Sequence, residues 1–502
     1  MNAPLRRVGV VVLVLFAMLY LNLNWVQAYR ADEYRNSDYN GRVLITEYER
    51  ARGKIVNAQG VAVADSKETN GEYKFLRVYP FGEQYAHVLG YKPLTLASTD
   101  LEKLENDFLA GTADEQTAER LEAMFTGKKN PGGNVLLTLS KATQETAFNE
   151  LKANKRGAVR GAVVALDPST GALLAAVSMP SYDPNPLVVH DTNKASAEYN
   201  RLDKDENKPL RNRAFSETFP PGSTFKVVTS AAAMMNLGLD PGSVLQGGDS
   251  FLPPQTTVPI RNSTGVNCPD SITLKQALTV SCNTAFARLG VEKIGADRLK
   301  AMARDFGFES EPRFDRDEKT NYMGVAPSRT GAMQVSDKDT RVDPPALAQS
   351  SIGQRDVRMT PLQGAMIAAT VANDGSLMRP YLVDKLQLAD LTVISPTETK
   401  QIRRPLSGQV AAGLQEMMIS VVQSGTGKNA RINGFDVGGK TGTAENAEDA
   451  LDHGWFIGFA RKGGKGHMAV AVFLENAGRG GSGEAARIAG QVMKAYIAEK
   501  GL

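Results

Sequence analysis

The first feature of the hydrophobic pattern is a long apolar stretch close to the start of the chain. Residues 8–28 are apolar with few exceptions, which is about the length that crosses the hydrocarbon layer of a membrane. Arg6 and Arg7 come directly before this stretch, and basic residues favour the cytoplasmic side of a membrane. We therefore predict a transmembrane anchor over residues 8–28, a cytoplasmic tail over residues 1–7 and an exported remainder.

An alternative for the same stretch is a signal peptide that is removed after export. Residues 26–28 end in alanine and form an acceptable processing site. The apolar stretch is longer than the core of an ordinary signal peptide, which favours an uncleaved anchor. Either interpretation exports the rest of the chain.

Beyond the anchor, the pattern indicates a polar connection and two globular parts. Residues 30–50 are polar and suit a stalk next to the membrane. An Asn-Pro-Gly-Gly sequence at 130–133 breaks the chain where two apolar patterns meet. We place the hinge in this region, and predict an N-terminal domain over residues 29–150 and a second domain over residues 151–502.

Helical periodicity is clear on both sides of that hinge. Residues 101–111 have the spacing of an amphipathic helix that ends at a glycine. Residues 135–139 read as a short apolar strand, and residues 141–152 as a second amphipathic helix. None of these three segments carries a pattern that indicates chemistry.

Strand patterns begin and end the second domain. Two apolar runs surround a Pro-Ser-Thr-Gly turn at 168–171, which indicates a hairpin. Strand-like runs return at 455–460 and 468–474, and helical stretches lie between these early and late strands. This order predicts a mixed α/β (α+β) fold in which helices cover an antiparallel sheet.

Composition narrows the function by exclusion. The 502 residues are 42% hydrophobic and 23% charged, which suits a globular chain of two or three domains. A net charge of +3 without a basic, aromatic-rich tract argues against nucleic acid. The four histidines are scattered, no C-x-x-C is present, and no metal or cofactor is expected. A G-x-S-x-G elbow is also missing, so lysine is the plausible catalytic base.

Candidate chemistry centres on Ser223 and Lys226. A Phe-Pro-Pro-Gly sequence breaks the chain just before Ser223, and an apolar helix follows Lys226. Ser223 is therefore expected at the first helical turn, with Lys226 on the same face. An ammonium in an apolar pocket loses solvation, its pKa falls, and it becomes able to take the proton of the serine. Alone, such a pair is more often a cap and a solvated amine.

Two further motifs follow in order, and together the three resemble a known family. Ser281 and Asn283 form an S-x-N motif, and residues 440–443 read K-T-G-T. The ordered set S-x-x-K, S-x-N and K-T-G resembles the penicillin-binding proteins and serine β-lactamases. Residues 161–171 and 453–459 resemble the same family. The resemblance implies the penicillin-binding transpeptidase fold: an antiparallel sheet covered by helices, with a helical subdomain.

The N-terminal domain resembles the elongated pedestal of the class B members of this family. Residues 52–55 and 77–91 resemble the two signatures of that pedestal, and their arginines are expected to pair within the fold. Residues 56–60 depart from the Asp-Arg-Asn-Gly turn that is common in the family. The overall likeness is to the actinobacterial penicillin-binding protein A group.

The resemblance assigns a role to each motif residue. Ser223 would attack the peptide carbonyl, Lys226 would take its proton, and Ser281 would relay a proton to the leaving amine. The backbone amides of Ser223 and Thr443 would form the oxyanion hole. The residues expected to bind substrate are Asn283, Lys440, Thr441, Gly442 and Thr443. Gly442 would be small so that the strand can approach the substrate.

The resemblance therefore implies an enzyme of the bacterial cell membrane. It would be a peptidoglycan D,D-transpeptidase that acts on D-Ala-D-Ala stem peptides and is acylated by β-lactam antibiotics. Without a glycosyltransferase of its own, it would work with a membrane glycan polymerase of the SEDS family. The alternatives are a hydrolase, either a D,D-carboxypeptidase or a β-lactamase, and a non-catalytic β-lactam-binding scaffold.

The two cysteines allow one further prediction. Cys268 and Cys282 both lie in the exported part, and Cys282 is inside the S-x-N motif. Paired cysteines in exported proteins are usually bridged. We predict a Cys268–Cys282 disulfide that holds the motif, with two buried free thiols as the alternative.

Overall fold

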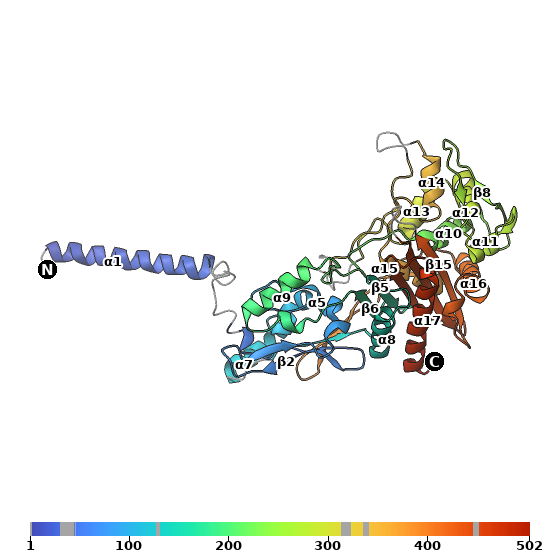
Figure 1. Cartoon of the computed structure of the whole chain (residues 1–502). Helices are drawn as coiled ribbons and strands as arrows, with labels where there is room; N and C mark the ends of the chain where they lie inside the picture. Colours follow the sequence, from blue (N-terminus) through green and yellow to red (C-terminus); the bar gives the residue numbers. More distant parts are fainter. Residues whose placement is uncertain are drawn as a thin grey trace.

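The structure of the chain is a computed structural model that describes residues 3–30, 45, 47–126, 131–312, 323–334, 341–444 and 451–502. At its start, helix α1 (Ala3–Asn24) continues into a π-helical segment (Trp25–Tyr29). Figure 1 shows α1 extending away from the body of the protein. Pro4–Tyr29 is long and apolar enough to cross a membrane, and its apolar core lies in the range predicted for the anchor. Most of the predicted stalk, residues 30–50, lies outside the described residues.

The centre of the second domain is a five-stranded antiparallel sheet with the order β15-β16-β17-β5-β6. Its strands are β5 (Gly161–Leu166), β6 (Leu173–Met179), β15 (Asp436–Ala444), β16 (His453–Lys462) and β17 (Lys465–Leu474). The predicted hairpin supplies β5 and β6, and the predicted C-terminal strands supply β16 and β17. Early and late segments thus meet in one sheet, with β15 at its edge.

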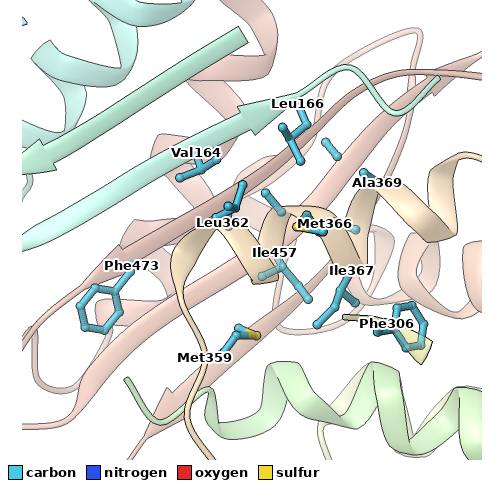
Figure 2. Close-up of a cluster of buried hydrophobic side chains, with 14 of the residues drawn as sticks. Val164, Leu166, Phe306, Met359, Leu362, Met366, Ile367, Ala369, Ile457 and Phe473 are labelled. Carbon is cyan, nitrogen blue, oxygen red and sulfur yellow. The ribbon is translucent and has the colours of Figure 1, made fainter. Parts of the chain in front are cut away.

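Helices bury both faces of this sheet, which explains why strand β5 is buried and without a polar side chain along its whole length. In β5, Val164 belongs to a core shared with α15 (Pro361–Ala372), whereas Val163 belongs to a core shared with α17 (Gly481–Lys500) and α8 (Lys141–Lys152). In Figure 2, side chains of α15 lie beside Val164 on the first face. Alternate residues of a strand point to opposite faces, so two covered faces require a continuous apolar run. The predicted mixed α/β fold is confirmed.

A helical subdomain lies against the first face of the sheet (Figure 1). Its central helix is α10 (Lys226–Leu237), whose residues from Lys226 to Met234 are all buried. The surrounding helices are α11 (Leu274–Val280), α12 (Asn283–Leu289), α13 (Ala296–Asp305), α14 (Pro344–Ser350) and α16 (Gly408–Gln423). Short strands in this half of the chain are β7 (Val244–Gln246), β8 (Ser250–Phe251), β9 (Ile260–Arg261), β10 (Ser271–Thr273), β11 (Leu377–Met378) and β14 (Gln401–Arg403).

A second sheet, of six strands, forms the N-terminal domain with the order β13-β12-β4-β1-β2-β3. Four of its strands precede residue 150: β1 (Ile55–Val56), β2 (Ala62–Glu68), β3 (Phe75–Val78) and β4 (Asn134–Leu137). The other two, β12 (Val383–Gln387) and β13 (Val393–Pro396), come from the second half of the chain. A break in the sequence at residue 150 therefore does not coincide with the border between the two sheets.

The helices between the anchor and β4 are short. In the described residues they are α4 (Ala86–Leu89), α5 (Asp100–Leu104), α6 (Asn106–Ala110) and α7 (Thr117–Thr126), and a longer helix, α9 (Thr192–Lys204), follows β6. The single helix expected over residues 101–111 is in fact α5 and α6, because Glu105 leaves helical geometry with φ −103° and ψ 26°. The predicted glycine stop is present, since Gly111 caps α6 in the left-handed conformation.

The arginines of the two pedestal signatures pair inside the fold, as expected. Arg52 and Arg77 donate to the two carboxylate oxygens of Glu102, over 2.8 and 2.6 Å. Glu102 is fully buried; burial alone would raise its pKa, but the two arginines hold that pKa below its ordinary value. The two signatures are thus joined to α5 through Glu102, and removal of one partner would leave a charge without compensation.

Candidate active site

The segment that carries Ser223 is a short 3-10 turn (Gly222–Phe225) that leads directly into α10. Ser223 was expected in the first turn of this helix; it lies in the 3-10 turn, and Lys226 begins α10. Gly222 adopts φ +52°, and its N–H donates to the carbonyl of Gly353 over 2.9 Å. A Cβ on Gly353 would lie 2.1 Å from the carbonyl oxygen of Gly222, so this approach of two backbones requires glycine. Ser223 is half-buried among buried neighbours.

Lys226 is fully buried and has three close oxygen neighbours. Its Nζ donates to the carbonyl of Ser281 over 2.8 Å and to Oδ1 of Asn283 over 2.7 Å, and lies 3.3 Å from Oγ of Ser281. The pKa of Lys226 is lowered well below its ordinary value by burial and, secondly, by the charge of Lys440. A neutral amine has two N–H donors, and the two carbonyl oxygens can accept both. Its lone pair then remains for a hydroxyl proton.

The turn between α11 and α12 sets these contacts. Ser281 ends α11 with φ +65°, which is uncommon for a residue with a side chain. Both its carbonyl and its hydroxyl lie within hydrogen-bond distance of Lys226. Cys282 caps α12 and is bonded to Cys268, with 5.7 Å between the Cα atoms. The disulfide therefore joins the strained turn to a segment 14 residues earlier in the chain.

Lys440 approaches the same hydroxyl from strand β15. Its Nζ donates to Oγ of Ser281 over 2.9 Å and to its neighbour's carbonyl, that of Thr441, over 2.9 Å. Burial lowers the pKa of Lys440 to about 7. No carboxylate in the described part of the chain contributes to the pKa of either buried lysine. The site thus holds two amines that protonate with difficulty, with one hydroxyl between them.

Gly442 brings β15 against the nucleophile segment. A Cβ at this position would lie 2.6 Å from the carbonyl oxygen of Pro221 and 2.9 Å from Cγ2 of Thr224. The sequence suggested that Gly442 lets the strand approach the substrate, which stays a prediction; the structure adds a second reason for glycine, the packing of the strand on the residues beside Ser223. A Cβ on Gly222 would in turn lie 2.3 Å from the carbonyl oxygen of Thr443.

The two threonines of the K-T-G-T motif differ in their surroundings. Thr441 is nearly buried, and its hydroxyl makes a short hydrogen bond with the hydroxyl of Thr426. Thr443 is exposed, at the edge of the sheet, with its backbone beside Gly222. The structure therefore brings the three motifs together. Ser281 of the second motif contacts Lys226 of the first and Lys440 of the third.

Residues outside the three motifs also hold the site, and the sequence analysis gave them no role in it. The indole N–H of Trp455 donates to the carbonyl of Pro220 over 2.9 Å. The side chain of Asn283 donates to the carbonyl of Arg261 over 3.0 Å, and Asn262 accepts from the backbone of Asn283 over 2.8 Å. Local patterns gave no signal for Asn262, because its partner is 21 residues further along the chain.

The described residues contain no group of three or more histidine, cysteine, aspartate or glutamate side chains that could hold a metal ion. The site itself offers a serine hydroxyl, two amines with lowered pKa values and the amides around them. This set is suited to acyl transfer through a serine ester.

Comparison of the sequence with known protein families shows where this set of site residues occurs. Residues 161–494 match the penicillin binding protein transpeptidase domain, which is more than half of the chain. The chain belongs to the penicillin-binding protein transpeptidases. Residues 52–135 match the penicillin binding protein A dimerisation domain, so the family resemblance seen in both parts of the sequence is confirmed.

Relatives cover the whole chain. It is 42% identical over 503 residues to the peptidoglycan D,D-transpeptidase PbpA of Mycolicibacterium smegmatis, covering 99% of each protein. It is 43% identical to PbpA of Mycobacterium tuberculosis, over 95% of this chain and 94% of that protein. The resemblance to the penicillin-binding protein A group is therefore confirmed.

Solved structures of penicillin-binding protein A from M. tuberculosis share the fold. The imipenem acyl-enzyme complex superposes with a TM-score of 0.82 at 40% identity, covering 90% of this chain and all of that one. The penicillin G acyl-enzyme complex superposes with a TM-score of 0.80 at 40% identity and the same coverage. In both complexes the related protein carries a β-lactam as an acyl-enzyme.

Proposed function

We propose that this protein is a peptidoglycan D,D-transpeptidase that cross-links D-Ala-D-Ala stem peptides and is acylated by β-lactams. One observation carries the proposal: Lys226, buried and one turn after Ser223, has its N–H donors directed at the Ser281 carbonyl and the Asn283 amide oxygen. This arrangement leaves the lysine suited to act as a base rather than as a structural cation. The family membership and the names of its relatives agree with that role.

In the acylation step, Ser223 attacks the carbonyl between the two terminal D-alanines. Lys226, in its neutral form, takes the proton of the Ser223 hydroxyl while the new C–O bond forms. The N–H groups of Ser223 and Thr443 stabilise the oxyanion, a contribution of about 3–4 kcal/mol per donor in other enzymes. The close approach of the Gly222 and Thr443 backbones, and the position of β15 at the sheet edge, support this assignment.

Ser281 then passes a proton to the departing D-alanine amine as the C–N bond breaks. Its hydroxyl lies between Nζ of Lys226 and Nζ of Lys440, at 3.3 and 2.9 Å, so it can receive a proton from one side and donate it to the substrate. Asn283 donates from its amide to the substrate backbone while it holds Lys226. Each of these groups is already hydrogen-bonded in place, which limits the reorganisation that the reaction requires.

Lys440 binds the terminal carboxylate of the substrate, together with the hydroxyls of Thr441 and Thr443. Lys440 is buried, and no carboxylate in the described part of the chain offsets the effect of burial on its pKa. The carboxylate of an incoming substrate would supply that negative charge. Ionic hydrogen bonds in such a water-poor site are stronger than those between neutral groups. β-Lactams carry an equivalent carboxylate, which explains how one clamp serves both ligands.

The acyl-enzyme is resolved by an amine of a second stem peptide rather than by water. The anchor and the N-terminal domain support this choice over a simple hydrolase, because they hold the catalytic domain at the membrane where the polymer is made. The N-terminus is cytoplasmic and residues 29–502 are outside. Residues 29–150 form the pedestal, to which β12 and β13 add two strands, and the rest of 151–502 is the transpeptidase domain. The protein has no glycosyltransferase activity of its own and works with a membrane glycan polymerase of the SEDS family.

The direct test is to incubate the full-length protein in detergent with penicillin and to measure its intact mass, beside a Ser223→Ala control. We expect one penicilloyl adduct on Ser223 that is lost slowly, and none on the control. A folded protein that takes up no penicillin would contradict the proposal and favour the scaffold alternative. Rapid release of hydrolysed penicillin would favour a β-lactamase. A stem-peptide assay with an added amine acceptor then separates transfer from carboxypeptidase activity.

A further inference from the structure

A chain excursion between α10 and α11 is fastened to the start of α12. It contains the two-stranded β8–β9 hairpin and the segment that follows it up to Cys268. The hydroxyl of Thr284 donates to the carbonyl of Gly248 over 2.7 Å, and the disulfide joins Cys268 to Cys282. Further bonds between the end of β9 and α12 involve Asn262 and Arg261.

Asn262 caps α12 from outside the helix. Its Oδ1 accepts from the backbone N–H groups of Asn283 and Thr284, over 2.8 and 3.2 Å. Its Nδ2 donates to the carbonyl of Gly248 over 2.9 Å, which fixes the orientation of the amide. The first N–H groups of a helix have no partner within the helix, so this side chain satisfies donors that would otherwise be left open. Asn262 is thus bonded at both ends of its amide.

Asn262 binds the backbone of Asn283, and the side chain of Asn283 binds the proposed base, Lys226. Asn283 accepts from Nζ of Lys226 through its Oδ1 and donates to the carbonyl of Arg261 through its Nδ2. Two consecutive residues at the end of β9 therefore fix Asn283, one through its backbone and one through its side chain. No residue of the three motifs provides this support.

We infer that Asn262 is a positioning residue for acylation, which acts by holding Asn283 and, through it, the base Lys226. The inference rests on the proposed function and adds a residue to it. Without the Asn262 side chain, the first turn of α12 loses two hydrogen bonds, and Asn283 is free to shift relative to Lys226. Displacements of about 1 Å in such assemblies can cost about 100-fold in rate. Asn262 itself need not touch the substrate.

The test compares Asn262→Ala and Asn262→Asp in the full-length protein. Two quantities are measured with penicillin: the fraction of protein that can be acylated, from intact mass at long times, and the rate constant of acylation for that fraction. We expect Asn262→Ala to slow acylation of the competent fraction by roughly 10- to 100-fold. Asn262→Asp keeps an oxygen that accepts both N–H groups but loses the donor to the Gly248 carbonyl, so we expect its rate to lie between that of Asn262→Ala and that of the wild type.

A matched control lies in the same hairpin connection. The hydroxyl of Thr256 accepts from the N–H of Val258 over 3.1 Å, and Thr256→Ala removes this bond without touching α12. We expect Thr256→Ala to acylate at the wild-type rate. Equal slowing by Thr256→Ala and Asn262→Ala would overturn the inference. A wild-type rate constant for the competent fraction of Asn262→Ala would also overturn it, because a purely structural role lowers the fraction of protein that can be acylated and leaves the rate constant of that fraction unchanged.

If Asn262→Ala does not accumulate as folded protein, Asn262→Ser replaces it. A serine hydroxyl is too short to reach both N–H groups, so slow acylation of a folded variant is again expected, and an unchanged rate again overturns the inference. The wild-type measurement separates this result from the proposed function. A wild type that is not acylated contradicts the proposed function, whereas the inference fails only when the wild type reacts and the variants react equally fast.

Discussion

The Nζ of Lys440 lies 2.9 Å from the Oγ of Ser281, although the two residues are 159 positions apart in the sequence. This contact joins the edge of the sheet to the helical subdomain, across the site. Because burial lowers the pKa of Lys440 to about 7, the charge of the site changes near neutral pH. That change leads to a prediction about the rate of acylation.

We expect the second-order rate constant of acylation by penicillin to fall as the pH rises above about 7. Lys440 binds a carboxylate only as an ammonium, and its neutral form predominates above its pKa. Lys226 does not cause this fall, because it must be neutral to act, and a rising pH only favours that form. The measurement is a pH profile of the second-order rate constant, which reports the groups of the free enzyme.

Lys440→Arg provides the control for the pH profile, because a guanidinium stays charged throughout. We expect a lower maximal rate for this variant and no fall above pH 7. The acylatable fraction of each protein is measured at every pH, so that loss of folded protein is not counted as loss of rate. An identical fall in Lys440→Arg would show that another group titrates.

Gly442→Ala is expected to damage the site from the strand side. The added Cβ would lie 2.6 Å from the backbone carbonyl of Pro221, which a side-chain rotation cannot relieve. Overpacking of this kind costs about 1–3 kcal/mol, and here it moves the segment next to Ser223. We expect acylation to slow at least about tenfold. Gly483→Ala is the control, since its Cβ would meet only a side-chain nitrogen of Asn429 at 3.4 Å.

Much of this site could be predicted because most of its polar residues belong to short sequence motifs. A break before Ser223, an apolar helix after Lys226 and two later motifs were enough to point to Lys226, Ser281 and Lys440, which the structure brings into contact. Contacts between distant segments could not be predicted in the same way. Nothing in residues 383–396 indicates that they complete the N-terminal sheet, and the role of Gly442 depends on which backbone happens to lie opposite.

Removal of the Cys268–Cys282 disulfide is expected to lower both stability and the rate of acylation. The bond closes a loop across 14 positions, and loops of about that length give about 3 kcal/mol of stabilisation. The same bond holds the residue between Ser281 and Asn283, so its loss also loosens the contacts of Lys226. The measurement is denaturant unfolding and acylation kinetics of a Cys268→Ala, Cys282→Ala variant. Alkylation of two free thiols in the unreduced wild type would contradict the bond itself.

Glu102→Ala is expected to destabilise the N-terminal domain without changing the chemistry at Ser223. Glu102 is fully buried between Arg52 and Arg77, so its removal leaves the buried guanidinium of Arg77 without its carboxylate, whereas the half-buried Arg52 keeps a longer ion pair with Glu47. Breaking a buried ion pair in this way costs about 3–5 kcal/mol.

The measurement for Glu102→Ala is thermal unfolding together with the acylation rate constant of the competent fraction. The control is Glu198→Ala, which removes the partner of Arg201 on the exposed face of α9, where ion pairs contribute little. We expect a large loss of stability for the first variant, a small one for the second, and the wild-type rate constant for both. A slower rate constant in Glu102→Ala would mean that the N-terminal domain acts on the catalytic site, and not only as its support.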